Sequence, residues 1–212
     1  QYCPNAGQSA ITALYCSPGF FCINGSHVPA PPDGVTGYRC VAGTYCPTGT
    51  SKVLKCPVGT YNPNTESWNI TACVPCTPGK ACTQPGLAAP NADCQAGFYC
   101  PKGQIVPHPA AYVCPLGMTC PTGSSSPIHC PRGFFTRIVG QTSCLKCPAG
   151  YYCNVHDLCP CGNFTAPKLC PAGYYCPPGT EIAHQYPCPV GTFSIAVGIK
   201  YKANCTKCPA GK

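Results

Sequence analysis

The chain has 212 residues, enough for one or two ordinary domains, but only 8% of them are charged and they include 24 Cys, 28 Pro and 23 Gly. Pro and Gly interrupt every window of the length that an amphipathic helix needs, which excludes a helical protein with a conventional apolar core. The net charge is +8, and its densest group, Lys200, Lys202, Lys207 and Lys212, is interpreted as a solvated surface, with weak attraction to acidic polysaccharide as the alternative.

The cysteines indicate an oxidising compartment. An even number of them in a Pro- and Gly-rich chain is typical of a disulfide scaffold, so we expect an extracellular or cell-surface protein. No apolar run approaches the roughly 18 residues of a membrane span, and no nucleic-acid-binding motif is present. No signal peptide is visible, and the sequence stops inside a repeat, so we expect the native chain to continue past Lys212.

One short motif organises the sequence. Cys147-Pro-Ala-Gly-Tyr-Tyr-Cys153 recurs at residues 170–176 and in looser form elsewhere, and 17 of the 24 cysteines have glycine three residues later. Cys, Pro, x and Gly fit the four positions of a type I β-turn, with Pro second and Gly fourth. Two aromatic residues then predict a short extended piece. The motif brings a sulfur, a turn and an aromatic plate, and no catalytic group.

In chain order, the repeats form four segments. Residues 1–55 hold Cys3 and two short units of the form Cys-x5-Cys. A first super-repeat covers 56–129, a second covers 130–187, and a third begins at 188 and runs to 212. Each super-repeat opens with a long unit, whose next cysteine follows only at Cys73, Cys144 or Cys205, and each long unit ends in Cys-x2-Cys.

These units predict a small disulfide-rich repeat array, an elongated rod with little regular secondary structure, almost no helix and short two-stranded β pieces. Strands are expected at 59–61, 133–138 and 191–195. Each repeat is expected to contact mainly its neighbours. Aromatic pairs such as Tyr151/Tyr152 are expected to stack along the array, and the alternative is a ligand-binding aromatic strip.

The long unit followed by Cys-x2-Cys and Cys-Pro-x-Gly-Tyr-Tyr-Cys resembles the ephrin-receptor-like cysteine-rich repeats of extracellular proteins, over residues 40–212. The long unit is also similar to the opening module of tumour-necrosis-factor-receptor repeats. This resemblance implies three disulfides, Cys56–Cys73, Cys130–Cys144 and Cys188–Cys205. The resemblance identifies a module rather than a biological role.

Spacing alone leaves the partners of the other cysteines open. These are Cys3, Cys16, Cys22, Cys40, Cys46, Cys76, Cys82, Cys94, Cys100, Cys114, Cys120, Cys147, Cys153, Cys159, Cys161, Cys170, Cys176 and Cys208. Five of these cysteines lie at the N-terminal end of the chain, and one, Cys208, lies at the C-terminal end. This remainder fits a chain cut within a repeat, subunits joined head to tail, or a different pairing.

The sequence offers little catalytic chemistry. Its three Cys-x2-Cys pairs are too far apart for a zinc ribbon, and its five acidic residues are scattered. His156-Asp157 is the single His–Asp neighbour pair. We therefore expect no enzyme, no metal and no cofactor.

Glycans are the expected covalent additions. Asn24, Asn69, Asn163 and Asn204 each begin an Asn-x-Ser/Thr sequon. Residues 124–127 and 28–32 are candidate segments for O-linked sugars. We expect a glycosylated structural protein, either a stiff spacer or the subunit of a filament that assembles with itself or with other matrix proteins, and the mastigonemes of algal flagella contain similar repeats. The alternative is the ligand-binding ectodomain of a receptor or adhesin.

Overall fold

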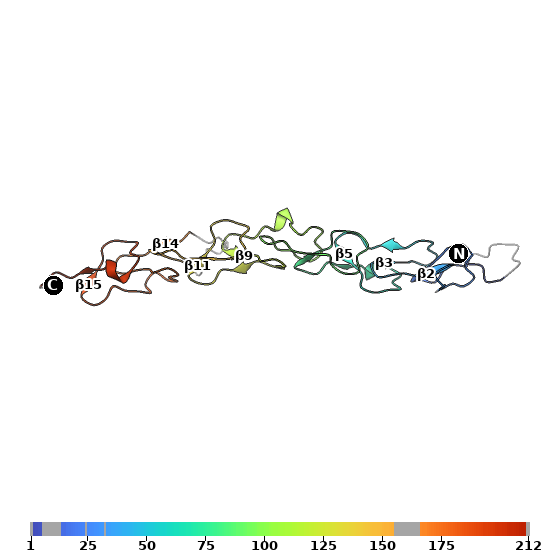
Figure 1. Cartoon of the computed structure of the whole chain (residues 1–212), viewed down its shortest axis with the longest axis horizontal. Helices are drawn as coiled ribbons and strands as arrows, with labels where there is room; N and C mark the ends of the chain where they lie inside the picture. The colour runs from blue at the N-terminus through green and yellow to red at the C-terminus, as the bar shows by residue number, and fades with distance from the viewer. Residues whose placement is uncertain (1, 6–13, 24, 32, 155–165, 211–212) are drawn as a thin grey trace. The chain divides into compact units, whose positions relative to one another are not determined.

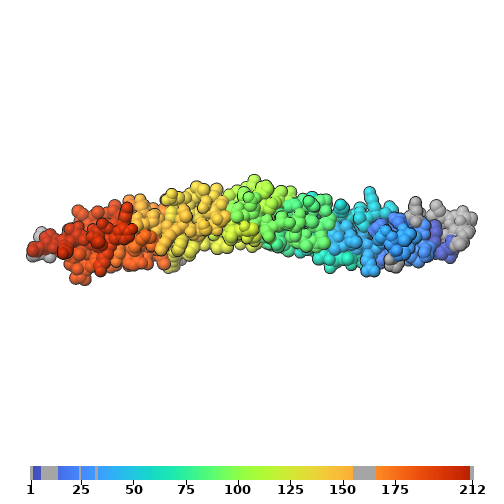
Figure 2. Space-filling view, in the orientation of Figure 1, coloured from blue at the N-terminus to red at the C-terminus, as the bar shows by residue number. Residues whose placement is uncertain are grey.

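The computed structural model describes residues 2–5, 14–23, 25–31, 33–154 and 166–210. The chain forms two compact units. The first comprises Gln1–Gln95, Cys100–Pro109 and Gly123–Ser125, and the second comprises Ala96–Tyr99, Ala110–Thr122 and Ser126–Lys212. Within each unit the surface colours follow chain order (Figure 2), so successive repeats are laid down one after another. The four sequence segments are a different division of the chain, and that division stays a prediction.

Every repeat begins at what we call a turn cysteine, followed three residues later by a turn glycine. The turn cysteines are Cys16, Cys40, Cys56, Cys76, Cys94, Cys114, Cys130, Cys147, Cys170, Cys188 and Cys208. The residue after the turn glycine donates its N–H to the carbonyl of the residue after the turn cysteine, as Tyr151 does to Pro148 at 3.2 Å. The turn glycines have φ between 76° and 88°, for example 86° at Gly150.

These bonds correct the predicted turn. The turn starts one residue later than expected, so Pro148 is its first residue and Gly150 its third. A φ near +80° at the third position is the signature of a type II turn, which requires glycine there. The cysteine therefore precedes the turn instead of opening it.

The strands are short, as Figure 1 shows for the labelled ones, and they pair two by two. Eight antiparallel pairs are present among the described residues: β1 (Phe20–Cys22) with β2 (Gly37–Arg39), β3 (Thr44–Tyr45) with β4 (Leu54–Lys55), β5 (Thr60–Tyr61) with β6 (Val74–Pro75), β7 (Lys80–Ala81) with β8 (Ala92–Asp93), β9 (Met118–Thr119) with β10 (Ile128–His129), β11 (Phe134–Phe135) with β12 (Leu145–Lys146), β13 (Tyr151–Tyr152) with β14 (Lys168–Leu169), and β15 (Thr192–Phe193) with β16 (Thr206–Lys207).

The register of these pairs is the same throughout. The two residues after each turn glycine pair with the two residues before the next turn cysteine, as Tyr151↔Leu169 and Tyr152↔Lys168 do. The repeats at Cys94 and Cys170 make one bridge each in the same place, Phe98↔Val113 and Tyr174↔Pro187. The strands expected at 59–61, 133–138 and 191–195 are confirmed as β5, β11 and β15, each only two residues long.

Helix is limited to three 3-10 turns in the described residues: η1 (Ile70–Ala72), η2 (Ala110–Tyr112) and η4 (Lys202–Asn204). The predicted fold class is therefore confirmed in its disulfide content, its short two-stranded sheets and its near absence of helix. Two of these turns, η1 and η4, stand directly before a cysteine that closes a long unit, Cys73 and Cys205.

Within each unit, four backbone hydrogen bonds recur between one repeat and the next. The turn cysteine donates to the preceding turn glycine, as Cys170 does to Gly150 at 2.9 Å. The turn glycine donates forward to the residue six positions after the next turn cysteine, as Gly150 does to Cys176 at 2.8 Å. Cys153 donates to Thr180 at 3.0 Å, and Gly179 donates back to Cys147 at 2.8 Å. These bonds satisfy backbone groups that regular sheets would otherwise pair.

A second glycine position, which we call the loop glycine, brings several repeats into contact with the next repeat but one. A Cβ atom on the turn glycine Gly97 would lie 2.7 Å from the carbonyl oxygen of the loop glycine Gly140, and one on Gly150 would lie 2.6 Å from that of Gly198. Each of these partners lies two repeats further along. The expectation that repeats contact mainly their neighbours is thus incomplete, because the turn glycine also contacts the repeat beyond.

The interior consists of disulfides rather than of aliphatic side chains. Proline and glycine apart, nineteen apolar residues of the described chain are buried; sixteen of them are half-cystines, and the other three are Ala81, Phe135 and Ile199. One small apolar cluster gathers Phe135, Cys147 and Cys153, with Tyr151 packed against it. Such an interior matches the composition, because these short segments cannot bury enough apolar surface to remain folded without cross-links.

Candidate functional sites

Ten disulfides join described cysteines. Each short unit closes on itself, giving the pairs Cys16–Cys22, Cys40–Cys46, Cys76–Cys82, Cys94–Cys100, Cys114–Cys120, Cys147–Cys153 and Cys170–Cys176. The long units contain Cys56–Cys73, Cys130–Cys144 and Cys188–Cys205, the same pairs that the family resemblance implies. Cys3 and Cys208 are unpaired and exposed, while Cys159 and Cys161 lie outside the described residues.

This pairing places the two cysteines of the first two Cys-x2-Cys pairs in different bonds. Cys73 is joined to Cys56, whereas Cys76 is joined to Cys82. Cys144 and Cys147 are likewise joined to Cys130 and Cys153. A disulfide sulfur cannot serve as a thiolate ligand, so these two pairs do not bind zinc in the oxidised protein. Among the described residues, no group of three or more His, Cys, Asp or Glu is placed to hold a metal ion.

A buried polar residue replaces the second cysteine in the first two long units. Asn62, six residues after Cys56, is fully buried; its Nδ2 donates to the Thr44 carbonyl at 3.0 Å and to the Ser67 hydroxyl at 2.9 Å. Its Oδ1 accepts from the Asn64 N–H at 3.0 Å. Thr136 holds the same position after Cys130, and its hydroxyl accepts from the Gly117 N–H at 2.7 Å. Sequence reasoning missed both residues, although their spacing from the turn cysteine marks them.

Two of the four sequon asparagines can be placed. Asn69 caps η1, where its Oδ1 accepts from the Thr71 N–H at 3.0 Å, and it is half-buried. Asn204 is exposed at the end of η4, and its Oδ1 accepts from the Tyr201 N–H at 3.2 Å. Asn24 and Asn163 lie outside the described residues. Occupancy of all four sequons stays a prediction.

The candidate O-glycan segments are only partly accessible. Ser124 and Pro31 are buried, whereas Ser125 and Ser126 are exposed. A sugar on Ser124 or on a hydroxylated Pro31 would have to displace its covering atoms. Of these positions, the exposed serines are the ones that could carry a glycan.

The carboxylates that can be placed serve local roles. Asp93 forms an ion pair with Lys80 across β7 and β8. In the exposed loop at 33–37, the Thr36 hydroxyl and then the Val35 and Thr36 N–H groups donate to Asp33, and these bonds lower the pKa of its carboxyl to about 2. His156 and Asp157 lie outside the described residues.

The aromatic side chains pair across the strand pairs. The ring five residues after the turn cysteine meets the ring two residues before the next one. Phe21 and Tyr38 stack with centroids 5.5 Å apart, Tyr175 and Tyr186 stack at 5.6 Å, and Tyr99 meets Tyr112 edge-on at 5.3 Å. The sequence predicted that pairs of adjacent rings such as Tyr174/Tyr175 stack along the array, whereas these contacts join rings from the two ends of one repeat.

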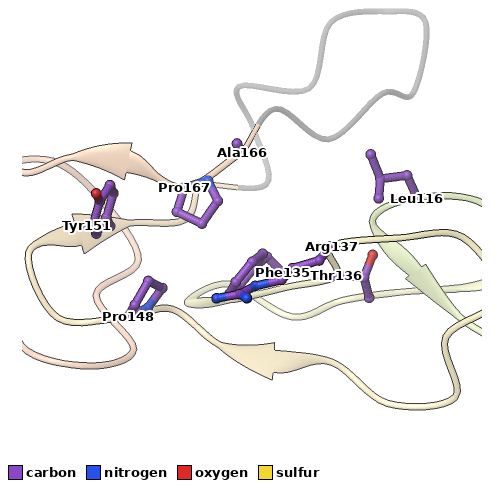
Figure 3. A pocket seen from close by; sticks show the side chains of 8 residues that line it. All are labelled: Leu116, Phe135, Thr136, Arg137, Pro148, Tyr151, Ala166 and Pro167. Carbon is purple, nitrogen blue, oxygen red and sulfur yellow. The ribbon is translucent and has the colours of Figure 1, made fainter.

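The second unit holds a hollow with an aromatic wall. This first hollow, of about 510 Å³, is shown in Figure 3, where Phe135 lies between the ring of Pro148 and Leu116. The remaining lining residues are Thr136, Arg137, Tyr151, Ala166 and Pro167. The Arg137 guanidinium stands 5.9 Å from the centroid of the Phe135 ring, a cation–π arrangement.

The second hollow lies in the first unit, measures about 410 Å³, and is lined by Phe21, Tyr38, Arg39, Val41 and Val53. The two hollows occupy the same place in the repeat. Each is bounded by the aromatic residue five positions after one turn cysteine (Phe135 or Phe21) and by the residue just after the next turn cysteine (Pro148 or Val41). Each also contains one arginine. Sequence reasoning did not find them, because the walls of the first come from three successive repeats and those of the second from two.

No protein-family model and no curated protein matches this chain. No helix in the described part of the chain is long and apolar enough to span a membrane. Ten disulfides and no such helix are compatible with an extracellular protein. The functional interpretation therefore depends on the repeat geometry and on the two hollows.

Proposed function

We propose that this chain is an extracellular structural protein, a disulfide-laddered rod that acts as a stiff spacer or as the subunit of a filament. The observation that supports this proposal is the recurrence, within each unit, of the same four hydrogen bonds between one repeat and the next. In the repeat at Cys147, for example, the disulfide Cys147–Cys153 closes the repeat on itself. Backbone hydrogen bonds then join this repeat to the one at Cys170. Stacked units joined in this way resist bending, since every joint is cross-braced.

The groups that recur in each repeat suit a structural role rather than a catalytic one. Its recurring groups are backbone amides, cystines and aromatic plates, which stabilise a shape and transfer no atoms, so we propose no catalytic role. Heterologous contacts between the ends of identical subunits generate open filaments. N-linked sugars on the sequons, including Asn69 and Asn204, would cover a sparsely charged surface. The resemblance to ephrin-receptor-like repeats and to mastigoneme proteins makes a cell-surface appendage the most concrete form of this proposal.

Electron microscopy of natively purified protein without reductant tests the structural role. We expect elongated particles or fibres with a fixed axial repeat, and small-angle scattering should give a radius of gyration well above the value of about 17 Å expected for a compact 212-residue domain. Protein treated with reductant serves as the control and should lose the regular particles. Compact, isolated particles under oxidising conditions would contradict the proposal.

A second candidate function is a ligand-binding ectodomain. The observation that favours it is the pair of hollows with aromatic walls and one arginine each, at equivalent places in the repeat. A uniform spacer has no need of such hollows, whereas a ligand needs concave, largely apolar walls with a few polar groups. Retention of a protein partner from extracellular extract, abolished by substitution of Arg137 and Arg39 together, would favour this role over the spacer.

A further inference from the structure

Glu66 departs from the repeat pattern at a position that otherwise requires glycine. The loop position is glycine in the other described repeats where it can be placed: Gly49, Gly86, Gly103, Gly123, Gly140, Gly179 and Gly198. Glu66 makes the same backbone bond as these glycines, from its N–H to the Cys40 carbonyl at 2.7 Å, and has φ of 59°. It is the one non-glycine residue with positive φ in the described chain. An L-residue with a side chain is strained in this conformation.

Strain of this kind points to a role for the side chain. The Glu66 Oε1 atom lies 3.2 Å from Nη1 of Arg39, and both side chains are about half exposed, at 45% and 58%. An exposed ion pair contributes little stability, so this pair does not by itself account for a strained backbone. The pair does fix the position of the Arg39 side chain, which lines the second hollow.

The second hollow combines flat apolar walls with this polar pair. Phe21 and Tyr38 stack at an interplanar angle of 20°, and Tyr38 remains 45% exposed. Val41, 57% exposed, and Val53 complete the apolar wall. All the lining residues lie in the first unit. The volume of about 410 Å³ falls within the range of small-molecule sites.

We propose that the second hollow, with Glu66 at its edge, binds a neutral saccharide. The C–H face of a sugar ring would lie on the Phe21/Tyr38 surface, and its hydroxyls would accept from Arg39 and donate to Glu66. Hydroxyls are both donors and acceptors, so they match a guanidinium and a carboxylate together. The two opposite charges cancel, so the site gives an anionic ligand no net attraction.

A proline-rich peptide is the other ligand that aromatic grooves receive. Its carbonyls could accept from Arg39, but proline has no N–H to donate to Glu66. The carboxylate would then be left without a partner on the ligand. The observed pair therefore favours a polyol. This site is independent of the proposed structural role, since a spacer without any ligand would still fold and assemble.

Saturation-transfer NMR and calorimetry on the oxidised full chain test the site, with cellohexaose, laminarihexaose and mannohexaose as probes and polyproline decapeptide and polygalacturonate as competitors. We expect at least one hexasaccharide to bind, and Tyr38→Ala to weaken it by about tenfold or more. The matched control is Tyr186→Ala, which removes the same cross-strand ring from the Tyr175/Tyr186 pair and lines neither hollow. This control should bind as the wild type does.

Glu66→Gly separates binding from folding. It removes both the carboxylate and the backbone strain, so we expect a thermal midpoint equal to or above that of the wild type and binding weaker by about tenfold. Failure of all three hexasaccharides to bind, equal losses in the two tyrosine variants, or unchanged binding in Glu66→Gly would overturn the proposal. Preferential binding of the peptide or of polygalacturonate would overturn it as well.

Discussion

At the scale of single residues, Asn62 shows how a side chain can replace a disulfide. The short units place a cystine six residues after the turn cysteine, but in the first long unit that turn cysteine bonds instead to Cys73. Asn62 fills the resulting place, fully buried, with three side-chain hydrogen bonds. A buried amide is stabilising only when its donors and acceptors are satisfied, as they are here.

Asn62→Ala should therefore lower the free energy of unfolding by about 2 to 4 kcal/mol, because three hydrogen bonds are lost and the Ser67 hydroxyl and Asn64 N–H lose their partner. The matched control is Ser194→Ala, at the same position of another long unit, where the side chain bonds only to Ala196 and is not buried. It should cost less than about 1 kcal/mol. Chemical unfolding followed by near-ultraviolet circular dichroism gives both values, and equal costs would contradict the account.

Asp33 gives a pH dependence with a defined sign. The pKa of its carboxyl is lowered to about 2 in the folded loop, from an ordinary value near 3.8, chiefly by the Thr36 hydroxyl and then by N–H groups of Val35 and Thr36. A lowered folded pKa means that the loop's stabilisation is present above the unfolded pKa and is lost as pH falls from about 4 through about 2.

We expect NMR titration of the oxidised chain to show the Asp33 carboxyl shift moving with a midpoint near 2 and the Val35 and Thr36 amide shifts moving with it. In Asp33→Asn these amides should show no transition in this range. A midpoint close to 4 in the wild type would disprove the loop bonds.

At the scale of elements, the type II turn and the contact between its turn glycine and a loop glycine set the spacing of the repeats. The type II turn needs glycine for its dihedral, and the approach of the repeat two positions along leaves no room for a Cβ atom at Gly97. Gly173 has a similar φ of 83°, but nothing lies within 4 Å of the place its Cβ would take. Gly173 is therefore required only for its backbone dihedral, whereas Gly97 is required both for its dihedral and because a Cβ atom would not fit.

Gly97→Ala should destabilise the chain by about 1 to 3 kcal/mol more than Gly173→Ala, because both lose the favoured dihedral but only the first forces a side chain against the Gly140 carbonyl. Differential scanning calorimetry and local amide exchange measure the two costs. Equal destabilisation would show that the contact with the repeat two positions along contributes nothing.

At the scale of the whole molecule, stability depends on cross-links more than on burial. Sixteen half-cystines make up most of the buried apolar residues. Closing the short loops of the Cys-x5-Cys units contributes about 2 kcal/mol each in the chain-entropy model. With ten such bonds, of both lengths, the covalent contribution exceeds what the remaining buried aliphatic and aromatic side chains supply.

Reduction should therefore unfold both units. We expect hydrogen exchange with mass spectrometry to show protected amides at the turn cysteines and turn glycines in the oxidised protein, and exchange at nearly unprotected rates throughout after treatment with a phosphine reductant. An alkylated sample that keeps its protection would show that hydrogen bonds and aromatic pairs suffice.

The sequence by itself determined the features that are local. The Cys-x-x-Gly spacing, the density of Pro and Gly and the isolated aromatic pairs were enough to predict cross-linked repeats, very short strands and almost no helix. These depend on dihedral preferences and loop lengths within a few residues of each other. The strands β5, β11 and β15 were found for this reason, although all their ends except the one at Tyr61 were placed one to three residues too far out.

Tertiary structure decided everything that joins one repeat to another. The turn begins at Pro148 rather than at Cys147 because the two groups that a turn at Cys147 would join are bonded to other repeats. The Cys147 carbonyl accepts from the Gly179 N–H, and the Gly150 N–H donates to the Cys176 carbonyl. Both hollows have walls from different repeats, the Phe21 and Tyr38 rings meet from the two ends of one repeat, and Asn62 is buried by atoms distant in sequence. Sequence spacing carries no record of such contacts, since they depend on which surfaces meet when the repeats stack.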